Sequence, residues 1–100
     1  EEDLANPKSN KGTHGFTTEE RAGVDHIIEG GFVDAFRLFT QGNGNYTWWS
    51  NFGNARARNV GWRIDYFFVS AALSSQVKEC TIRPEVMGSD HCPVVLDINL

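Results

Sequence analysis

Two acidic residues and one histidine are the side chains of this sequence that best suit chemistry on a phosphate group. Asp65 lies within the apolar run at residues 62–69, where burying an unpaired carboxylate would cost several kcal/mol. It therefore needs a partner, and the candidates are Arg63, on the same face of the expected strand, and His91. If His91 is the partner, Asp65 fixes the tautomer of the imidazole and leaves the other ring nitrogen to meet a water molecule or a phosphate.

The second acidic residue, Asp90, stands directly before His91 in the polar turn at residues 88–93. Its carboxylate, pointing away from the imidazole, is available to hold a hard cation such as Mg²⁺ through oxygen. A structural interpretation competes with this one. A buried aspartate often pairs with a structural arginine or with backbone amides, and a Ser-Asp-His turn before proline is common at protein surfaces. The residues by themselves leave both interpretations open.

A cluster of arginine and tryptophan forms a second candidate site. Residues 50–64 contain three arginines and no acidic residue, so this segment carries a charge of +3 in a chain whose net charge is −4. Trp48, Trp49 and Trp62 lie beside it, and arginine next to aromatic rings suits phosphates and unstacked sugars or bases. The alternative is that the tryptophans form core and the arginines a solvated loop.

The elements that must position these side chains follow from local patterns. A threonine followed by acidic residues starts a helix, and the glycine pair at residues 30–31 stops it, which predicts a helix over 18–29. Residues 33–39 predict a short helical turn. Alternating apolar, β-branched and aromatic residues predict strands at residues 46–49, 62–69, 77–82 and 93–100. A helix against an antiparallel sheet of about four strands is an α+β arrangement.

The composition places these elements in one small globular domain. The chain has 100 residues, of which 40% are hydrophobic and 22% charged, which excludes a disordered, collagen-like or coiled-coil protein. The net charge of −4 excludes a generic polycationic coat for nucleic acid. Cys80 and Cys92 are expected to be buried thiols, and His14 and His26 ordinary exposed histidines. The low cysteine content, with no long apolar segment and no leader, predicts an intracellular protein outside the membrane.

Several blocks of this sequence resemble one enzyme family. They are Asn-Ala-Arg at residues 54–56, the run at 59–67 that contains Trp-Arg-Ile-Asp, and Gly-Ser-Asp-His-Cys-Pro at 88–93; residues 15–21 and 34–37 also match. In this order and spacing they closely resemble the C-terminal part of the exonuclease III family of apurinic/apyrimidinic endonucleases. The resemblance covers nearly the whole chain. It implies a hydrolase that uses Mg²⁺ or Mn²⁺ to cleave DNA on the 5′ side of abasic sites, often with 3′ to 5′ exonuclease activity.

The resemblance also implies a role for each matching residue. Asp90 would help to bind the metal, and His91, oriented by Asp65, would contact the scissile phosphate or assist the attacking water. The pocket for a flipped abasic sugar would be lined by Trp48, Trp62 and Ile64. The residues expected beside the double-stranded DNA are Arg56, Arg58, Asn59, Asn6 and Asn10.

A fold and a set of partners follow from the same resemblance. Members fold as a four-layer αββα sandwich of the DNase I type, and residues 1–100 match the C-terminal half of that domain. The family's glutamate metal ligand, catalytic tyrosine and Asp-x-Asn motif have no counterpart in these residues, so we expect them to be inactive alone. An apolar inner face of the sheet would then pair with the missing N-terminal half or with a second copy of the chain.

Two alternatives stay open. Another metal-dependent phosphoesterase of the same superfamily would share the Ser-Asp-His turn but act on a different substrate, such as an inositol phosphate; the arginine- and tryptophan-rich segment speaks against it. A non-catalytic DNA-binding or assembly domain is compatible with the negative net charge. Depending on the source, the protein is expected in the cytoplasm and nucleoid or in the nucleus.

Overall fold

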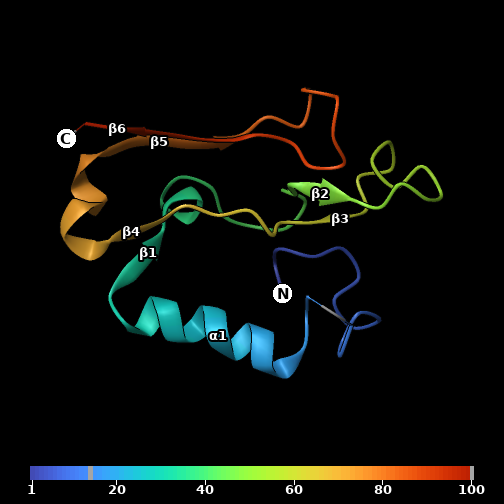
Figure 1. Ribbon diagram of the computed structural model, residues 1–100, viewed down its shortest axis with the longest axis horizontal. Helices are drawn as coiled ribbons and strands as arrows, with labels where there is room; N and C mark the ends of the chain where they lie inside the picture. Colours follow the sequence, from blue (N-terminus) through green and yellow to red (C-terminus); the bar gives the residue numbers. More distant parts are fainter. Residues whose placement is uncertain (14, 100) are drawn as a thin grey trace.

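Three short antiparallel strand pairs form the frame of the protein, as seen in a computed structural model that describes residues 1–13 and 15–99. The pairs are β1 (Phe32–Asp34) with β4 (Phe68–Ser70), β2 (Trp48–Trp49) with β3 (Gly61–Trp62), and β5 (Val77–Ile82) with β6 (Val94–Ile98) (Figure 1). The predicted α+β class is confirmed. The single sheet of about four strands is wrong, because the pairs are three separate two-stranded sheets. The expectations for His14 and for position 100 lie outside the described residues.

The helix predicted over 18–29 is confirmed as α1 (Thr18–Glu29). The hydroxyl of Thr17 accepts the Glu20 amide at 3.2 Å, and the Gly30 amide donates to the His26 carbonyl at 3.0 Å, so both ends are capped locally. None of its residues is buried, and α1 lies along one side of the molecule next to β1 (Figure 1). Within residues 1–13 and 15–99, no helix is long and apolar enough to cross a membrane.

The strand expected over 62–69 is interrupted, because its backbone donors find partners outside a regular ladder. The Arg63 amide donates to the Asp3 carbonyl at 2.6 Å, and the amides of Ile64 and Asp65 donate to the Thr47 hydroxyl at 3.1 and 3.2 Å. The chain pairs with β2 before this break and with β1 after it. The predicted pairing of 46–49 with 62–69 is therefore confirmed only at Trp48–Trp62, and the next pair joins Trp49 to Gly61, just outside the expected strand.

The segment between α1 and β2 contains both an expected and an unexpected element. The helical turn predicted for 33–39 is confirmed as a 3₁₀ helix, η1 (Ala35–Leu38). The strand β1 in front of it was not predicted, since three residues are too few to show an alternating pattern. A second 3₁₀ helix, η2 (Ala71–Gln76), connects β4 to β5.

Two small cores hold the strand pairs together. One contains Ala35, Phe36, Val69, Val77 and Cys80, and lies where η1 meets β4 and β5. The other is formed by Tyr46, Trp49, Ala55 and Cys92 and lies beneath β2. Both thiols are buried, as the sequence predicts, and burial raises the pKa of each.

A buried hydroxyl in β5 gives a prediction about stability. The Oγ1 atom of Thr81 is buried and has no hydrogen-bond partner among residues 1–13 and 15–99. Because an unsatisfied buried hydroxyl costs free energy, Thr81→Val is expected to raise the free energy of unfolding by about 1 kcal/mol. Urea denaturation measures this change. Thr81→Ser, which keeps the hydroxyl, is the control, and a Thr81→Val protein that is less stable than the parent would contradict the prediction.

Candidate active site

Asp65 and His91 meet across strand β2. The Asp65 Oδ2 atom lies 2.7 Å from Nδ1 of His91, which is the contact that their residue types predict. Trp48 pairs with Trp62 on one side of β2 and bridges to His91 on the other, so the two flanking segments are brought to either side of one strand. No partner for Nε2 of His91 occurs in the part of the chain that the structure describes. That nitrogen is available to a ligand.

The surroundings of Asp65 differ from the expectation in two ways. Its side chain is 41% exposed, not buried among apolar neighbours, because residues 63–67 leave the strand ladder. Arg63, the other candidate partner, does not contact it and binds Asp3 and Asp34 instead. The side chain of Asp65 therefore contacts His91 and is also partly open to solvent.

Asp90 projects beside this pair and is held by an indole. The Nε1 atom of Trp48 donates to Oδ2 of Asp90 at 3.0 Å, and this hydrogen bond holds the pKa of Asp90 below its usual value. The Ser89 hydroxyl also accepts the His91 amide at 3.1 Å, which fixes the turn. An ionised carboxylate with exposed oxygen suits Mg²⁺, which is commonly held by one or two carboxylates together with phosphate oxygens. Among residues 1–13 and 15–99, no three potential metal ligands cluster together.

The aromatic side chains predicted to line a pocket are partly assembled. The rings of Trp48 and Trp62 stand edge to face with centroids 6.3 Å apart, and Phe16, which the residue-by-residue reasoning did not select, packs against Trp62 in the same way. Gly15 makes room for this contact, since a Cβ there would lie 2.8 Å from the Trp62 ring. Ile64 is 39% exposed and lines a groove together with Phe16.

Trp49 is part of the core, as the structural interpretation of the tryptophans holds. Its side chain is buried, and Gly61 is needed opposite it, because a Cβ at this glycine would lie 2.5 Å from the indole. The indole Nε1 donates to the Asn59 side chain at 3.1 Å, and the Asn59 amide donates to the Gly44 carbonyl at 2.9 Å. The Asn59 side chain thus joins two loops to β2.

Arg56 holds the loop that leads into the turn at 88–93. Its guanidinium donates to three carbonyls, those of Pro84, Val86 and Ser89, at 2.8 to 2.9 Å, and lies 4.5 Å from the centre of the Trp49 ring. Both terminal nitrogens are therefore used inside the protein. Arg58, by comparison, binds the Gly53 carbonyl through Nε at 3.0 Å.

Asn6 and Asn10 shape the first loop of the chain. The Asn10 side chain donates to the carbonyls of Ala5 and Asn6 at 3.1 Å, and Asn6 has a left-handed backbone with φ of 54°. The Ala5 amide in turn donates to the Gly61 carbonyl, which ties this loop to β3.

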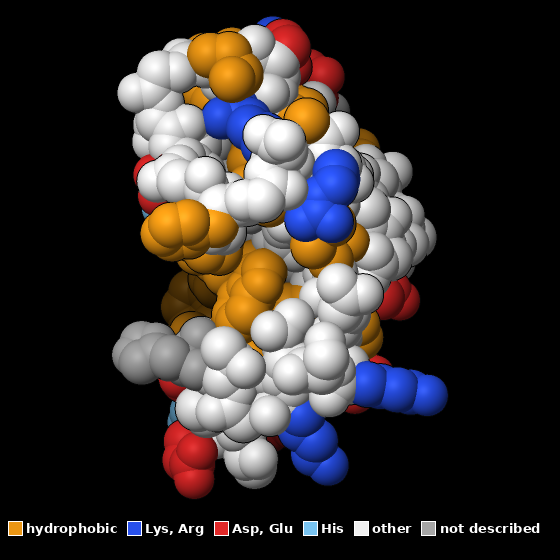
Figure 2. Space-filling view, turned by 90° about the vertical axis from the view of Figure 1, so that its right-hand side faces the viewer, with side chains coloured by type: hydrophobic (Ala, Val, Ile, Leu, Met, Phe, Trp, Pro, Cys, Tyr) orange, Lys and Arg blue, Asp and Glu red, His pale blue; other side chains and the backbone are white. Residues whose placement is uncertain are grey.

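Figure 2 views the end of the molecule where, in Figure 1, β2, β3 and their loops lie. Hydrophobic side chains fill a hollow there, and Lys and Arg side chains lie around it.

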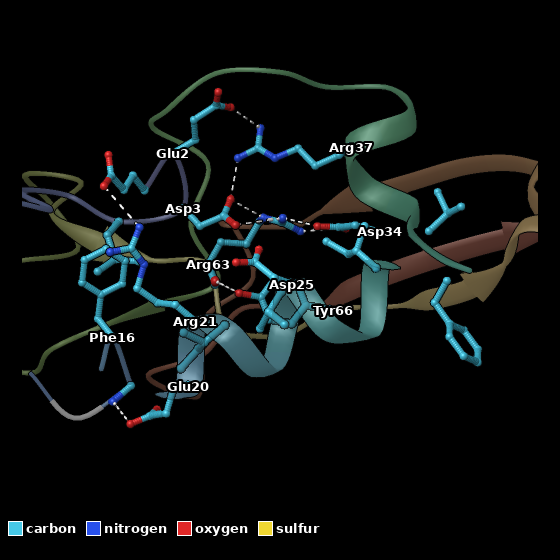
Figure 3. Close-up of a pocket in the computed structure, with 18 of the residues that line it drawn as sticks. Glu2, Asp3, Phe16, Glu20, Arg21, Asp25, Asp34, Arg37, Arg63 and Tyr66 are labelled. Carbon is cyan, nitrogen blue, oxygen red and sulfur yellow. Dashed lines mark hydrogen bonds and ion pairs between the residues drawn. The ribbon is translucent and has the colours of Figure 1, made fainter. Parts of the chain in front are cut away.

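A buried cluster of charges supports the segment that carries Asp65 (Figure 3). Arg63 is 1% exposed and binds Asp3 through Nε at 2.7 Å and Asp34 through both terminal nitrogens. Burial opposes the charge on Arg63, but the hydrogen bonds that it donates to Asp34 and Asp3 outweigh this effect and raise its pKa. Burial likewise opposes ionisation of Asp3, but Arg63 and Arg37 hold the pKa of Asp3 below its ordinary value. Sequence reasoning missed this cluster, since Asp3 lies 60 positions from Arg63.

The cluster forms part of a groove of about 700 Å³ that is lined by residues of α1, β1 and η1 and by the segments at 1–4 and 63–66. Burial raises the pKa of Tyr66, whose hydroxyl donates to the Arg63 carbonyl at 2.7 Å in the groove wall, to about 12. Several large apolar side chains on and near these elements remain 40–49% exposed: Ile27, Ile28, Phe32, Leu38 and Phe39. These exposed apolar side chains lie around α1, β1 and η1, and only Phe32 belongs to a strand, so they do not form the inner sheet face that was expected.

The sequence is similar to those of known nucleases. An exodeoxyribonuclease from Bacillus subtilis is 50% identical in an alignment of 99 positions that covers 98% of this chain. A DNA-(apurinic or apyrimidinic site) endonuclease from Dictyostelium discoideum is 52% identical in an alignment of 101 positions that covers 97% of this chain. The chain spans 39% and 28% of the lengths of these two relatives. It therefore matches only part of each.

Solved structures agree with the sequence comparison. The fold is similar to that of a 3′ phosphatase from Neisseria bound to product DNA hairpin, with a TM-score of 0.89, 26% identity and coverage of 100% of this chain and 40% of that one. An AP endonuclease from Leishmania major is 46% identical, with a TM-score of 0.76 over 82% of this chain and 25% of its own. The resemblance to exonuclease III-type enzymes is confirmed. Residues 2–91 match the profile of the endonuclease/exonuclease/phosphatase family, and the chain belongs to that family.

Proposed function

We propose that this chain supplies the C-terminal half of the catalytic domain of a DNA repair nuclease that hydrolyses the phosphodiester bond on the 5′ side of an abasic site. The observation that carries this proposal is the 2.7 Å contact between Asp65 and His91, with Asp90 projecting next to them. The DNA-(apurinic or apyrimidinic site) endonuclease from Dictyostelium discoideum, at 52% identity, supports the choice of substrate.

The residues of the site have separate tasks in this reaction. Asp65 accepts the Nδ1 proton of His91 and so holds the imidazole with Nε2 toward the substrate, where it binds a phosphate oxygen or the attacking water. Asp90 contributes one carboxylate to a Mg²⁺ or Mn²⁺ site, kept ionised by the Trp48 indole. The metal ion, when bound, neutralises charge on the phosphate.

Recognition of the abasic nucleotide falls to the aromatic side chains and loops of the same end of the molecule. The half-buried rings of Trp48 and Trp62, with Ile64, suit an extruded sugar that carries no base. Phe52 is 84% exposed, more than any other large apolar side chain described, and its loop also carries Arg58. An exposed phenylalanine can insert between base steps, so we add Phe52 to the DNA-contacting residues.

Of the remaining candidates, Arg56, Asn59 and Asn10 organise loops that face the DNA, and Arg58 contacts a phosphate. Because the guanidinium of Arg56 and the amide of Asn59 are used by protein groups, their role is to hold the loops at 84–89 and 43–45. Asn10 does the same for the first loop, where Asn6 and Asn10 lie near a phosphate strand in the proposed complex. Arg58, whose Nε binds a carbonyl at the base of its own loop, is the arginine that we assign to a DNA phosphate.

A second segment or chain is needed to complete the site. The family's glutamate metal ligand, catalytic tyrosine and Asp-x-Asn motif have no counterpart in these residues, and the described residues contain no cluster of three potential metal ligands. We therefore expect the 100 residues alone to show no turnover. The exposed apolar side chains around α1 and β1 suit contact with the N-terminal half of the relatives' domain or with a second copy. An abasic-site cleavage assay of the 100-residue chain tests this, and turnover would refute it.

Substitution of Asp90 tests the proposal in the natural polypeptide that carries these residues. On a duplex with one abasic site, we expect Asp90→Asn to raise the Mg²⁺ concentration for half-maximal incision by roughly 10- to 100-fold. Asp97→Asn, which changes an exposed carboxylate on β6, is the matched control and should leave that Mg²⁺ concentration unchanged.

The same protein tests the two alternative functions. Binding of abasic duplex without incision would favour the non-catalytic alternative, and faster hydrolysis of an inositol phosphate would favour the other phosphoesterases. Release of phosphate from a 3′-phosphorylated strand measures the reaction suggested by the Neisseria structure.

A further inference from the structure

Thr47 is a buried polar residue next to the segments that carry Asp65 and His91. It is 0% exposed and immediately precedes β2. Its hydroxyl oxygen accepts the backbone amides of both Ile64 and Asp65, at 3.1 and 3.2 Å. A single oxygen thus satisfies two donors at the point where the chain leaves β3.

The backbone of Thr47 reaches the other half of the catalytic pair. Its amide donates to the Trp62 carbonyl at 2.9 Å, and its carbonyl accepts the amide of Cys92, the residue after His91, at 2.8 Å. Thr47 therefore bonds to the segment that carries Asp65 on one side and to the segment that carries His91 on the other. It joins the two segments directly, next to the pairing that Trp48 makes with Trp62 and His91.

The hydroxyl is important because the strand ladder ends at Trp62. Beyond that point, the amides of Ile64 and Asp65 have no strand to donate to, and buried amides without partners are costly. The Thr47 oxygen takes the place of a ladder partner and fixes the backbone of Asp65 while leaving its carboxylate directed to His91.

We propose that Thr47 is a positioning residue for the Asp65–His91 pair, an inference that rests on the proposed function of that pair. Loss of the hydroxyl leaves two amides without an acceptor, so the backbone at 64–65 moves and the contact between Asp65 and His91 lengthens. The imidazole then loses the group that fixes its tautomer. Thr47 acts through Asp65 and does not touch the substrate.

Three substitutions in the natural polypeptide that carries these residues test this role. Thr47→Val removes the hydroxyl with little change in shape, Thr47→Ser retains it, and Thr81→Val removes a buried threonine hydroxyl that has no described partner. We expect Thr47→Val to lower kcat for incision of abasic duplex by roughly 10- to 100-fold with little change in KM, since small misplacements of catalytic groups have costs of this size. Thr47→Ser should recover most of the rate, and Thr81→Val should match the parent.

The imidazole of His91 provides a readout that a merely structural role would not move. In ¹⁵N-edited NMR spectra of the parent, the Nδ1 proton held by Asp65 should be visible and the Nδ1–H tautomer dominant. Thr47→Val should broaden that proton and mix the tautomers, whereas Thr47→Ser and Thr81→Val should not. A folded Thr47→Val protein with the parent's spectrum and kcat would overturn the proposal.

Hydrogen exchange in the unsubstituted protein decides the question if Thr47→Val does not fold. The amides of Ile64 and Asp65 lie outside any strand, yet we expect them to exchange more than about tenfold more slowly than in an unstructured chain, because the Thr47 oxygen accepts both. Exchange at the unstructured rate would refute the proposal. An absence of incision in the parent, combined with the expected NMR and exchange results, would refute the proposed function and leave the positioning role of Thr47 supported.

Discussion

Replacement of Arg63 by methionine is expected to lower the free energy of unfolding by about 3–5 kcal/mol, the cost of breaking a buried ion pair by removing one partner. Arg63 is 1% exposed, and Arg63→Met leaves Asp3 and Asp34 without the guanidinium that binds both. The guanidinium also lies over the rings of Phe36 and Tyr66, so packing is lost with the charge. Urea or thermal denaturation measures the change.

The matched control for this prediction is Arg21→Met. Arg21 pairs with Glu1 at the surface, where both side chains are well exposed, so its removal should cost about 0–1 kcal/mol. A stability of Arg63→Met equal to that of the control would show that the charge cluster is not buried in solution.

The pH dependence of stability gives a second check on the same cluster. The pKa of Asp3 in the folded protein is held below its ordinary value of 3.8, so the folded state binds its proton less readily than the unfolded chain does. The stabilisation is complete above pH 3.8 and is lost as the pH falls through the lower folded value. In Arg63→Met this acid-dependent loss should shrink. If Arg63→Met lost as much stability at low pH as the parent does, Arg63 would not be the group that lowers the pKa of Asp3.

Replacement of His91 is expected to have the largest effect on activity. His91→Gln should lower kcat for incision of abasic duplex by about 10²- to 10⁴-fold, the usual contribution of a positioned proton-transfer group. Its side chain is 42% exposed, so the fold should be retained, and circular dichroism can verify this. Incision by the natural polypeptide that carries these residues, at saturating Mg²⁺, is the measurement.

Two further variants are needed to interpret the effect of His91→Gln on kcat. His26→Gln, on the exposed surface of α1, is the matched control and should keep the parent's rate. Asp65→Asn removes the charge that orients the imidazole but keeps the shape of the side chain, so it should reduce kcat while leaving the affinity for abasic duplex unchanged. Full activity of His91→Gln would eliminate the Asp65–His91 pair as the catalytic centre.

Features that depend on near neighbours in the chain follow from the sequence. The helix over 18–29 is predictable because its caps involve Thr17, Glu20 and Gly30, all at its ends. The strand over 77–82 matches β5, and β6 lies within the expected 93–100, since alternation along a few residues is a local signal. The contact between Asp65 and His91 was one of two candidates that residue type allowed.

Only the tertiary structure decided between partners that are far apart in the chain. Arg63 finds Asp3 and Asp34 instead of Asp65, and Arg56 uses its donors on the loop at 84–89 instead of facing outward. The expected strand 62–69 divides between two partners because Thr47 and Asp3 accept the amides at the break.

The physical reason for this difference is the separation along the chain between the residues that interact. Helix caps and strand alternation are set by hydrogen bonds and side-chain spacing within a few residues, so the sequence alone determined α1, β5 and β6. The partner of a buried charge or of a strand edge depends on which groups the fold buries next to one another. That is decided by packing between segments that are distant in the chain. For that reason the Arg63 cluster and the place of Thr47 between Asp65 and His91 were decided by the tertiary structure.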